Sequence, residues 1–193
     1  MKPRSAGDFY VMRRTRSLVG VFALALVAFT GRAELPQASA SVNLEHRANL
    51  DVPAGKFATP LTGNATQREI IAEIALTELH FVDPWAPSAF VGFSSPDGKT
   101  QFKAFIVQTT PMATALIAGY MLVINGEVQP PKPLVSLIPL HEPVVFHAKR
   151  LVNGDLRIQV AGSDVVVFQT FNKELLPFID VSSAKAILSW TVH

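Results

Sequence analysis

The sequence predicts an all-β protein, an antiparallel β-sandwich, from three observations. Turn signals of the Asn-Gly, Asp-Gly and Gly-Ser-Asp kind separate short runs that are rich in β-branched and aromatic residues. Within these runs apolar and polar residues alternate, which places them on opposite faces of a strand. The 193-residue chain has no cysteine. Its stability therefore depends on a hydrophobic core, which about 150 residues can supply.

The turn signals recur at near-regular spacing. They are Pro96-Asp97-Gly98, Asn125-Gly126, Asn153-Gly154 and Gly162-Ser163-Asp164. Asn-Gly and Asp-Gly accept the positive φ that type I′ hairpin turns require. Several short strands joined by such turns indicate a sandwich or a barrel.

Alternation assigns the faces of the later strands. In 156-LRIQV-160 the three aliphatic residues share one face, and Arg157 and Gln159 share the other. In 186–193 the face that contains Trp190 is apolar and the opposite face is mixed. We expect Trp190 and Tyr120 to lie in the core, because their neighbours on the same face are apolar.

Two segments are harder to interpret. The run 66-TQREIIAEIALTELHF-81 has the Thr66–Glu69 spacing of a helix capping box, and it also fits a long strand with Ile70 and Ile74 on one face. We predict a strand, because every later segment is β and needs partners. The proline-rich run 129–143 is predicted to be a loop with at most a short edge strand, since proline cannot donate to a ladder.

The N-terminus predicts export. Residues 1–16 are basic and 17–31 are apolar and uncharged, as in a secretory signal peptide. The apolar run is shorter than the roughly 20 residues that span a bilayer. We predict a signal peptide of residues 1–33, with cleavage after Ala33 or alternatively after Ala40, and Met12 is an alternative start. Residues 34–65 are predicted to be a linker or lead-in with one edge strand, and 66–193 the sandwich domain of a secreted or periplasmic protein.

Removing residues 1–33 takes away six of the 17 basic and one of the 15 acidic residues. The remaining 11 basic and 14 acidic residues give a net charge of −3. This balance argues against nucleic acid as a partner. No transmembrane segment is expected in the mature chain.

The order of segments resembles the concanavalin A-like lectin/glucanase jelly roll, in the broad laminin-G-like sense. The segments are 69-EIIAEIALTELHF-81, 88-SAFVGFSS-95, 97-DGKTQFKAFIV-107, 143-PVVFHAKRLVNGDLRIQVAGSDVVVF-168 and 178-FIDVSSAKAILSWTV-192. They look like an opening pair of strands, a hairpin return, a central meander and a closing strand. The resemblance implies the fold but does not choose among lectins, hydrolases and adhesion modules.

No catalytic constellation is evident. The Glu-x-Asp-x-Glu pattern of the glucanases is absent. Glu69 and Glu73 would share a strand face roughly 13 Å apart, too far for a glycosidase pair. Glu73 and Glu78, separated by an odd number of residues, are predicted to point to opposite faces. Ser94 and Ser95 lack the second glycine of a nucleophile elbow.

Metal sites are not predicted either. His80 with Asp83, and His141 with Glu142 and His147, contain ligand types without a recognised spacing. Calcium is the one cofactor that the resemblance leaves open. Its oxygen ligands would come from four acidic residues that we predict to lie in turns: Asp83, Asp97, Asp164 and Asp180.

Trp85 and Asp83 are the predicted ligand-binding residues. In 83-DPWAP-87 two prolines restrict the backbone around Trp85, so that the indole is presented rigidly for stacking on a sugar. Asp83 beside it can accept hydrogen bonds from sugar hydroxyls. The alternative is a structural role, in which Trp85 covers the end of the sandwich.

Together these observations predict an exported, non-catalytic binding module for a glycan or another surface polymer. A glycan-active hydrolase of the same fold, with acids that converge from distant loops, is one alternative. A structural or adhesive cell-surface protein is the other. Ligand identity and oligomeric state are not predicted.

Overall fold

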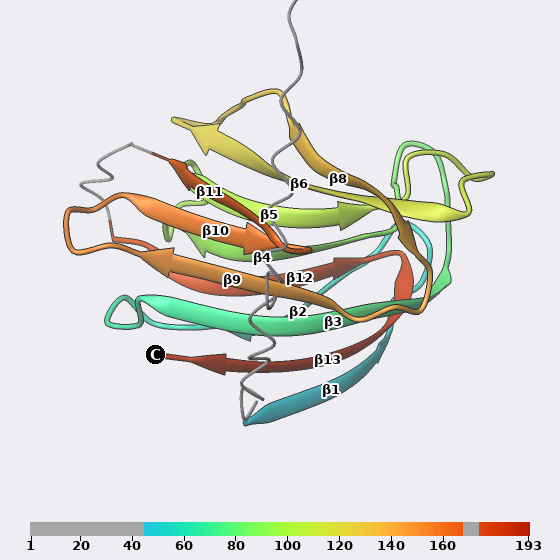
Figure 1. Ribbon diagram of the computed structural model, residues 1–193, viewed down its shortest axis with the longest axis horizontal. Coiled ribbons are helices and arrows are strands. Elements are labelled where there is room, and N and C mark those ends of the chain that lie inside the picture. Colours follow the sequence, from blue (N-terminus) through green and yellow to red (C-terminus); the bar gives the residue numbers. More distant parts are fainter. Residues whose placement is uncertain (1–44, 168–173) are drawn as a thin grey trace, which may run out of the picture. The chain divides into compact units, whose positions relative to one another are not determined.

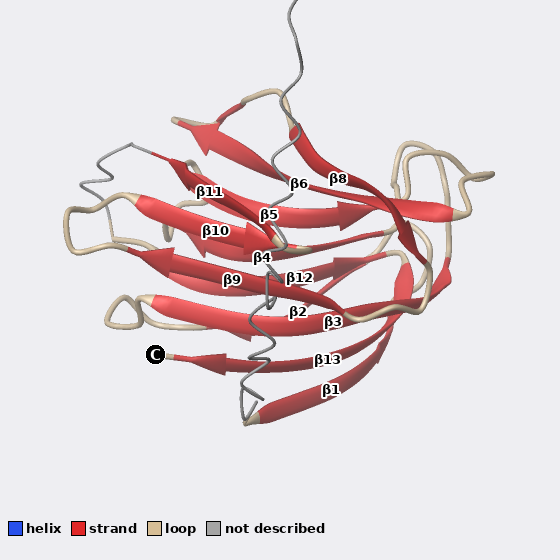
Figure 2. Ribbon diagram, in the orientation of Figure 1, coloured by secondary structure: helices blue, strands red, loops and turns tan. Residues whose placement is uncertain are grey.

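The computed structural model describes residues 45–167 and 174–193. These residues form thirteen β-strands and no helix (Figures 1 and 2). In this part of the chain there is accordingly no helix long and apolar enough to cross a membrane. The predicted signal peptide and both cleavage sites lie outside the described residues.

The strands pair antiparallel in two sheets. The six-stranded sheet has the order β1 (His46–Asp51), β13 (Ala184–Val192), β3 (Glu69–Leu79), β9 (Val144–Arg150), β10 (Leu156–Val160) and β11 (Ser163–Val167). The seven-stranded sheet has the order β2 (Phe57–Thr62), β12 (Leu176–Ser182), β4 (Ser88–Ser94), β5 (Gln101–Val107), β6 (Ala115–Ile124) and β7 (Glu127–Val128), and β8 (Lys132–Pro139) also pairs with β6. Figure 1 shows the two layers, with β9 and β10 in front of β4 and β5.

The core lies between the two layers. It is built from every second residue of each strand, such as Ile70, Ile74 and Phe146 on one sheet and Phe93 and Phe102 on the other. The predicted antiparallel β-sandwich is therefore confirmed. Trp190 is buried in this core and Tyr120 packs against it, as the alternation predicted.

The run 69–79 is a strand, as predicted, but it contains a bulge that the sequence analysis did not foresee. Ile70 and Ile74 face the core. The register with β13 shifts between Leu76 and Glu78, so that no residue of β13 lies directly opposite Thr77. Glu78 consequently forms an ion pair with Lys185 on the outer face, the face of Glu73. The prediction of opposite faces was wrong, because a bulge reverses the alternation beyond it.

Two segments contain more strand than predicted. The lead-in contributes two strands, β1 and β2, instead of one, and each is the edge of a different sheet. The proline-rich run forms the eight-residue strand β8, which pairs only with β6. As an edge strand it tolerates Pro133 and Pro139, because the missing N–H groups interrupt no central ladder.

The turn signals act largely as expected. Asn125 and Gly126 have φ values of 55° and 86°, which a type I′ turn between β6 and β7 requires. Between β10 and β11 the two positive-φ residues are Ala161 and Gly162, at 47° and 79°, so that turn comes one residue earlier than the predicted signal.

Candidate functional site

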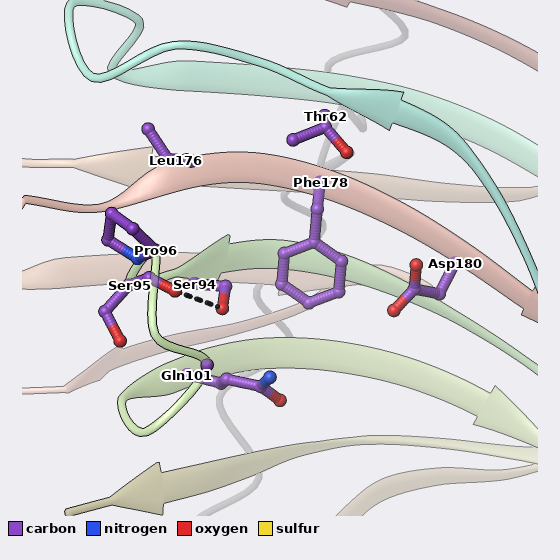
Figure 3. A pocket seen from close by; sticks show the side chains of 9 residues that line it. Thr62, Ser94, Ser95, Pro96, Gln101, Leu176, Phe178 and Asp180 are labelled. Atoms are coloured by element: carbon purple, nitrogen blue, oxygen red, sulfur yellow. Dashed lines mark hydrogen bonds between the residues drawn. The ribbon is translucent and has the colours of Figure 1, made fainter.

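The outer face of the seven-stranded sheet contains a hollow of about 230 Å³. Side chains of β2, β12, β4 and β5 line it together with the turn that follows β4. The lining residues include Thr62, Ser94, Gln101, Leu176, Phe178 and Asp180. Figure 3 shows the Phe178 ring between Asp180 on one side and Ser94 and Gln101 on the other.

A glycine in β4 accounts for the position of the hollow. Gly92 pairs with Phe178 of β12 on one side and with Lys103 of β5 on the other. Because it has no side chain, the sheet surface is lower between these two residues. A Cβ at this position would lie 2.0 Å from the carbonyl oxygen of Phe102, so no other residue fits the backbone.

The neighbouring row places two charges beside an aromatic ring. Asp180 pairs with Phe90, and the Lys103 Nζ atom lies 4.6 Å from the centre of the Phe90 ring. Asp180 accepts a hydrogen bond of 2.6 Å from the Thr59 hydroxyl. The sheet order thus brings Lys103 and Asp180, which are far apart in the sequence, to one side of the hollow.

Partial burial perturbs both charges in opposite directions. Burial raises the pKa of the Asp180 carboxyl, although the Thr59 hydrogen bond and the Lys103 charge oppose the shift. Burial lowers the pKa of the Lys103 ammonium, and the Asp180 charge opposes that shift. Ionisable groups with such shifts in a cleft are typical of functional sites.

Neither group has an ion-pair partner. Elsewhere in the described residues Lys149 contacts Glu69, Arg157 contacts Asp164, and Lys185 contacts Glu78 and Asp51. None of the ion pairs found in this part of the chain includes Lys103 or Asp180. The two charges therefore remain available to a ligand.

The described side chains that line the hollow offer hydrogen-bonding groups and apolar surface. Of the side chains that line it, Asp180 is the only carboxylate, whereas a glycosidase needs two. The Ser94 hydroxyl donates to the backbone carbonyl of Ser95, and the Ser95 hydroxyl donates to Asp97. Neither serine contacts a histidine that could act as its base.

The predicted binding residue Trp85 does not line this hollow. Its side chain is 43% exposed and packs edge-to-face on Phe57, with 5.1 Å between ring centres. Phe57 precedes Thr59 by two residues on β2, so the two share the outer face and Trp85 lies at the end of that face. Asp83 is exposed in the same turn.

The predicted ligand types for metals do not gather. His80 contacts the Val52 carbonyl and Glu78, and His147 contacts Glu69 and Gln159. Within the described ranges no three acidic or histidine side chains could share a metal ion. Asp164 lies in β11 and Asp180 in β12, so the prediction that both lie in turns was wrong.

Sequence reasoning missed Lys103, Phe90 and Phe178, and it named Asp180 only as a candidate calcium ligand in a predicted turn. A signal was present, because Gln101, Lys103 and Phe105 alternate with the core residues of β5, and Asp180 is a lone charge inside an apolar run. The sequence pattern does not, however, predict that β12 lies beside β4.

No protein-family model matches the chain, and no curated protein matches it significantly. Solved structures do resemble it. The carbohydrate-binding module CBM66 from Bacillus subtilis has a TM-score of 0.49 at 10% identity, over 76% of this chain and 93% of that one. A galectin from Caenorhabditis elegans has a TM-score of 0.48 at 12% identity, over 79% and 99%. An alginate lyase from Pseudomonas aeruginosa has a TM-score of 0.48 at 12% identity, over 72% of each chain.

These neighbours have the concanavalin A-like jelly-roll fold, so the predicted resemblance is found among solved structures. Each of the three TM-scores is below 0.5. The fold assignment therefore rests on the strand pairing itself, and no function is transferred from these proteins.

Proposed function

We propose that the protein is an exported, non-catalytic module that binds a glycan in the hollow on the outer face of the seven-stranded sheet. The observation that supports this most directly is the pair Lys103 and Asp180. Both are half-buried next to an aromatic ring, and neither has an ion-pair partner among the described residues. A stable domain has no structural need for such charges, because burial without a partner is unfavourable.

The other side chains of the hollow suit a sugar. Thr62, Ser94 and Gln101 offer hydroxyl and amide groups that both donate and accept, as sugar hydroxyls do. Leu176 and Phe178 offer apolar surface against which the C–H groups of a pyranose can pack. Binding sites for small molecules generally combine apolar walls with a few placed polar groups.

A second groove is the less favourable candidate. It crosses the outer face of the six-stranded sheet, with a volume of about 510 Å³, and includes Arg47, Asn49, Glu73 and Ser189. It contains no aromatic side chain. The hollow therefore remains the better site for a ligand with an apolar face.

Trp85 and Asp83 are proposed as a peripheral part of the same site. The Trp85 ring is exposed, and Phe57 supports it at the end of the face that contains Asp180. A longer glycan that occupies the hollow would reach it along β2. Trp85 would then stack on a second sugar, with Asp83 as a hydrogen-bond acceptor.

The test is a glycan array on protein purified from cells that express the full chain, followed by titration of the best ligand. Asp180→Asn should weaken binding by about tenfold or more, since a charged acceptor is lost. Asp164→Asn, the same change on the opposite sheet, should leave binding unchanged. Equal binding by both variants, or no saccharide bound by the wild type, would refute the proposal.

Export is tested separately. Intact-mass measurement of protein recovered from the medium or the periplasm should give a chain that begins after Ala33 or Ala40. A full-length N-terminus in those fractions would contradict the predicted signal peptide.

A further inference from the structure

The positive charge beside the hollow indicates what kind of saccharide the hollow takes. Lys103 differs from the other partly buried lysines of the sheet faces. Lys149 and Lys185 each contact a carboxylate, whereas the Lys103 ammonium lies over the face of the Phe90 ring. A ring face attracts a cation, but it supplies no oxygen atom to accept its hydrogen bonds.

We propose that the ligand is an acidic saccharide whose carboxylate binds the Lys103 ammonium while a hydroxyl of the same sugar donates to Asp180. This inference rests on the proposed glycan-binding function and specifies its substrate class. No acidic side chain of the described residues forms an ion pair with the ammonium, so the ligand supplies the anion. A charge-assisted hydrogen bond in a half-buried site is stronger than one between neutral groups.

The spacing of the two groups suits one sugar ring. Asp180 and Lys103 lie on strands that flank β4, and their partners on β4 are Phe90 and Gly92. Strand spacing and rise place their Cα atoms about 12 Å apart, and the Lys103 side chain extends back toward Phe90. The ammonium and the carboxylate are thus close enough for their charges to interact, but they do not form an ion pair.

Asp180 also restricts the ligand. Its Oδ1 atom accepts a hydrogen bond from the Thr59 hydroxyl, and its remaining lone pairs can accept hydrogen bonds from the hydroxyls of a sugar. A phosphate monoester would bring about two negative charges beside this carboxylate, so a singly charged acid fits better. The predicted mature net charge of −3 offers no general attraction for anions, which makes Lys103 the source of the preference.

The test compares trimers of galacturonic, glucuronic and mannuronic acid with their methyl esters by calorimetric titration of the purified protein. The ester keeps the sugar and the linkage and removes only the charge. At least one acid should bind about tenfold or more tightly than its ester. Lys103→Met should abolish the difference, and Lys103→Arg should retain it. Lys149→Met, the matched change on the opposite sheet, should have no effect, and thermal melting of each variant verifies that it is folded.

The outcomes separate this inference from the proposed function. If acids and esters bind equally well in the hollow, the glycan-binding function stands and the acidic preference is refuted. If neutral saccharides alone bind, the same conclusion follows. If a sulfated trimer binds and the uronates do not, a carboxylate ligand is excluded. If no saccharide binds, acidic or neutral, both the inference and the proposed function fail.

Discussion

The outer faces of the two sheets differ in how their charged side chains are paired. On the six-stranded sheet several charges of β3, β9, β10 and β11 are paired, because Glu69 contacts both His147 and Lys149, and Arg157 forms a two-pronged contact with Asp164. On the seven-stranded sheet Lys103 and Asp180 have no such partner among the described residues. Both faces are polar, but among the described residues only the seven-stranded sheet has two unpaired charges of opposite sign beside an aromatic ring.

The difference lies in the strand partners. His147 of β9 lies directly opposite Gln159 of β10 and Ile71 of β3, and Lys149 lies opposite Glu69. Cross-strand pairs of opposite charge stabilise a sheet. Beside the hollow, Lys103 lies opposite Gly92 of β4 and Met121 of β6, and neither of these cross-strand neighbours can neutralise its charge.

The largest expected effect concerns that glycine. Gly92→Ala should destabilise the protein by about 3 kcal/mol, because the new Cβ meets the backbone of β5 and no rotation relieves the contact. Urea unfolding measures it. Gly126→Ala is the matched control, since nothing lies within 4 Å of a Cβ there, although its φ of +86° still imposes strain. A loss at position 92 no larger than the loss at position 126 would show that the backbone of β5 relieves the contact with the new Cβ.

Trp85→Ala tests the peripheral part of the site. The ring is 43% exposed, so its removal should cost about 1–2 kcal/mol, less than the 3–5 kcal/mol typical of a buried tryptophan. Binding of a long glycan should weaken by about tenfold, as expected for a stacked ring. A loss of stability in the full range for a buried ring, with binding unchanged, would identify Trp85 as structural only.

Asp180→Asn should leave stability unchanged or raise it by up to about 1 kcal/mol at neutral pH, although it weakens binding. Burial raises the pKa of Asp180 in the folded protein. Its contribution to stability is therefore fully present below its ordinary pKa and is lost as the pH rises through the folded pKa. The gain of the Asn variant should grow as the pH rises above the ordinary pKa of an aspartate and should level off once the pH has passed the raised pKa of the folded protein. A variant that is less stable than the wild type at neutral pH would show that the carboxylate has a structural role.

The smallest effect on stability is expected for Glu69, on the outer face of the six-stranded sheet. Burial alone would raise the pKa of Glu69, but the hydrogen bonds with Lys149 and His147 outweigh it and the pKa is lowered. Its contribution is present above its ordinary pKa and is lost as the pH falls through the folded value. Glu69→Gln should cost less than about 1 kcal/mol at neutral pH and nothing in acid. An effect on glycan binding would place this network in the site.

The sequence predicted the elements better than their partners. Alternation correctly placed Leu156, Ile158 and Trp190 in the core, because a half-buried strand repeats every two residues. It failed for Glu78, since a single-residue bulge reverses the pattern without leaving a turn signal. It also failed for β8, whose prolines are compatible with an edge strand but not with a central one.

The site was harder to predict because it depends on the order of the strands. Lys103 and Asp180 lie on the same side of the sheet, on the two strands that flank β4, only because β12 pairs with β4, a pairing between distant segments that no local pattern encodes. The sequence instead indicated Trp85, whose flanking prolines are a local feature. The structure places Trp85 at the end of the same outer face, and its role in binding stays a prediction.

The most direct test is mapping of the bound glycan by NMR chemical shifts on the ¹⁵N-labelled protein. The backbone amides of Gly92, Lys103 and Asp180 should shift on titration, while those of His147 and Gln159 on the opposite sheet should not. Shifts confined to the six-stranded sheet, with Gly92 and Lys103 unperturbed at saturation, would contradict the assignment of the site.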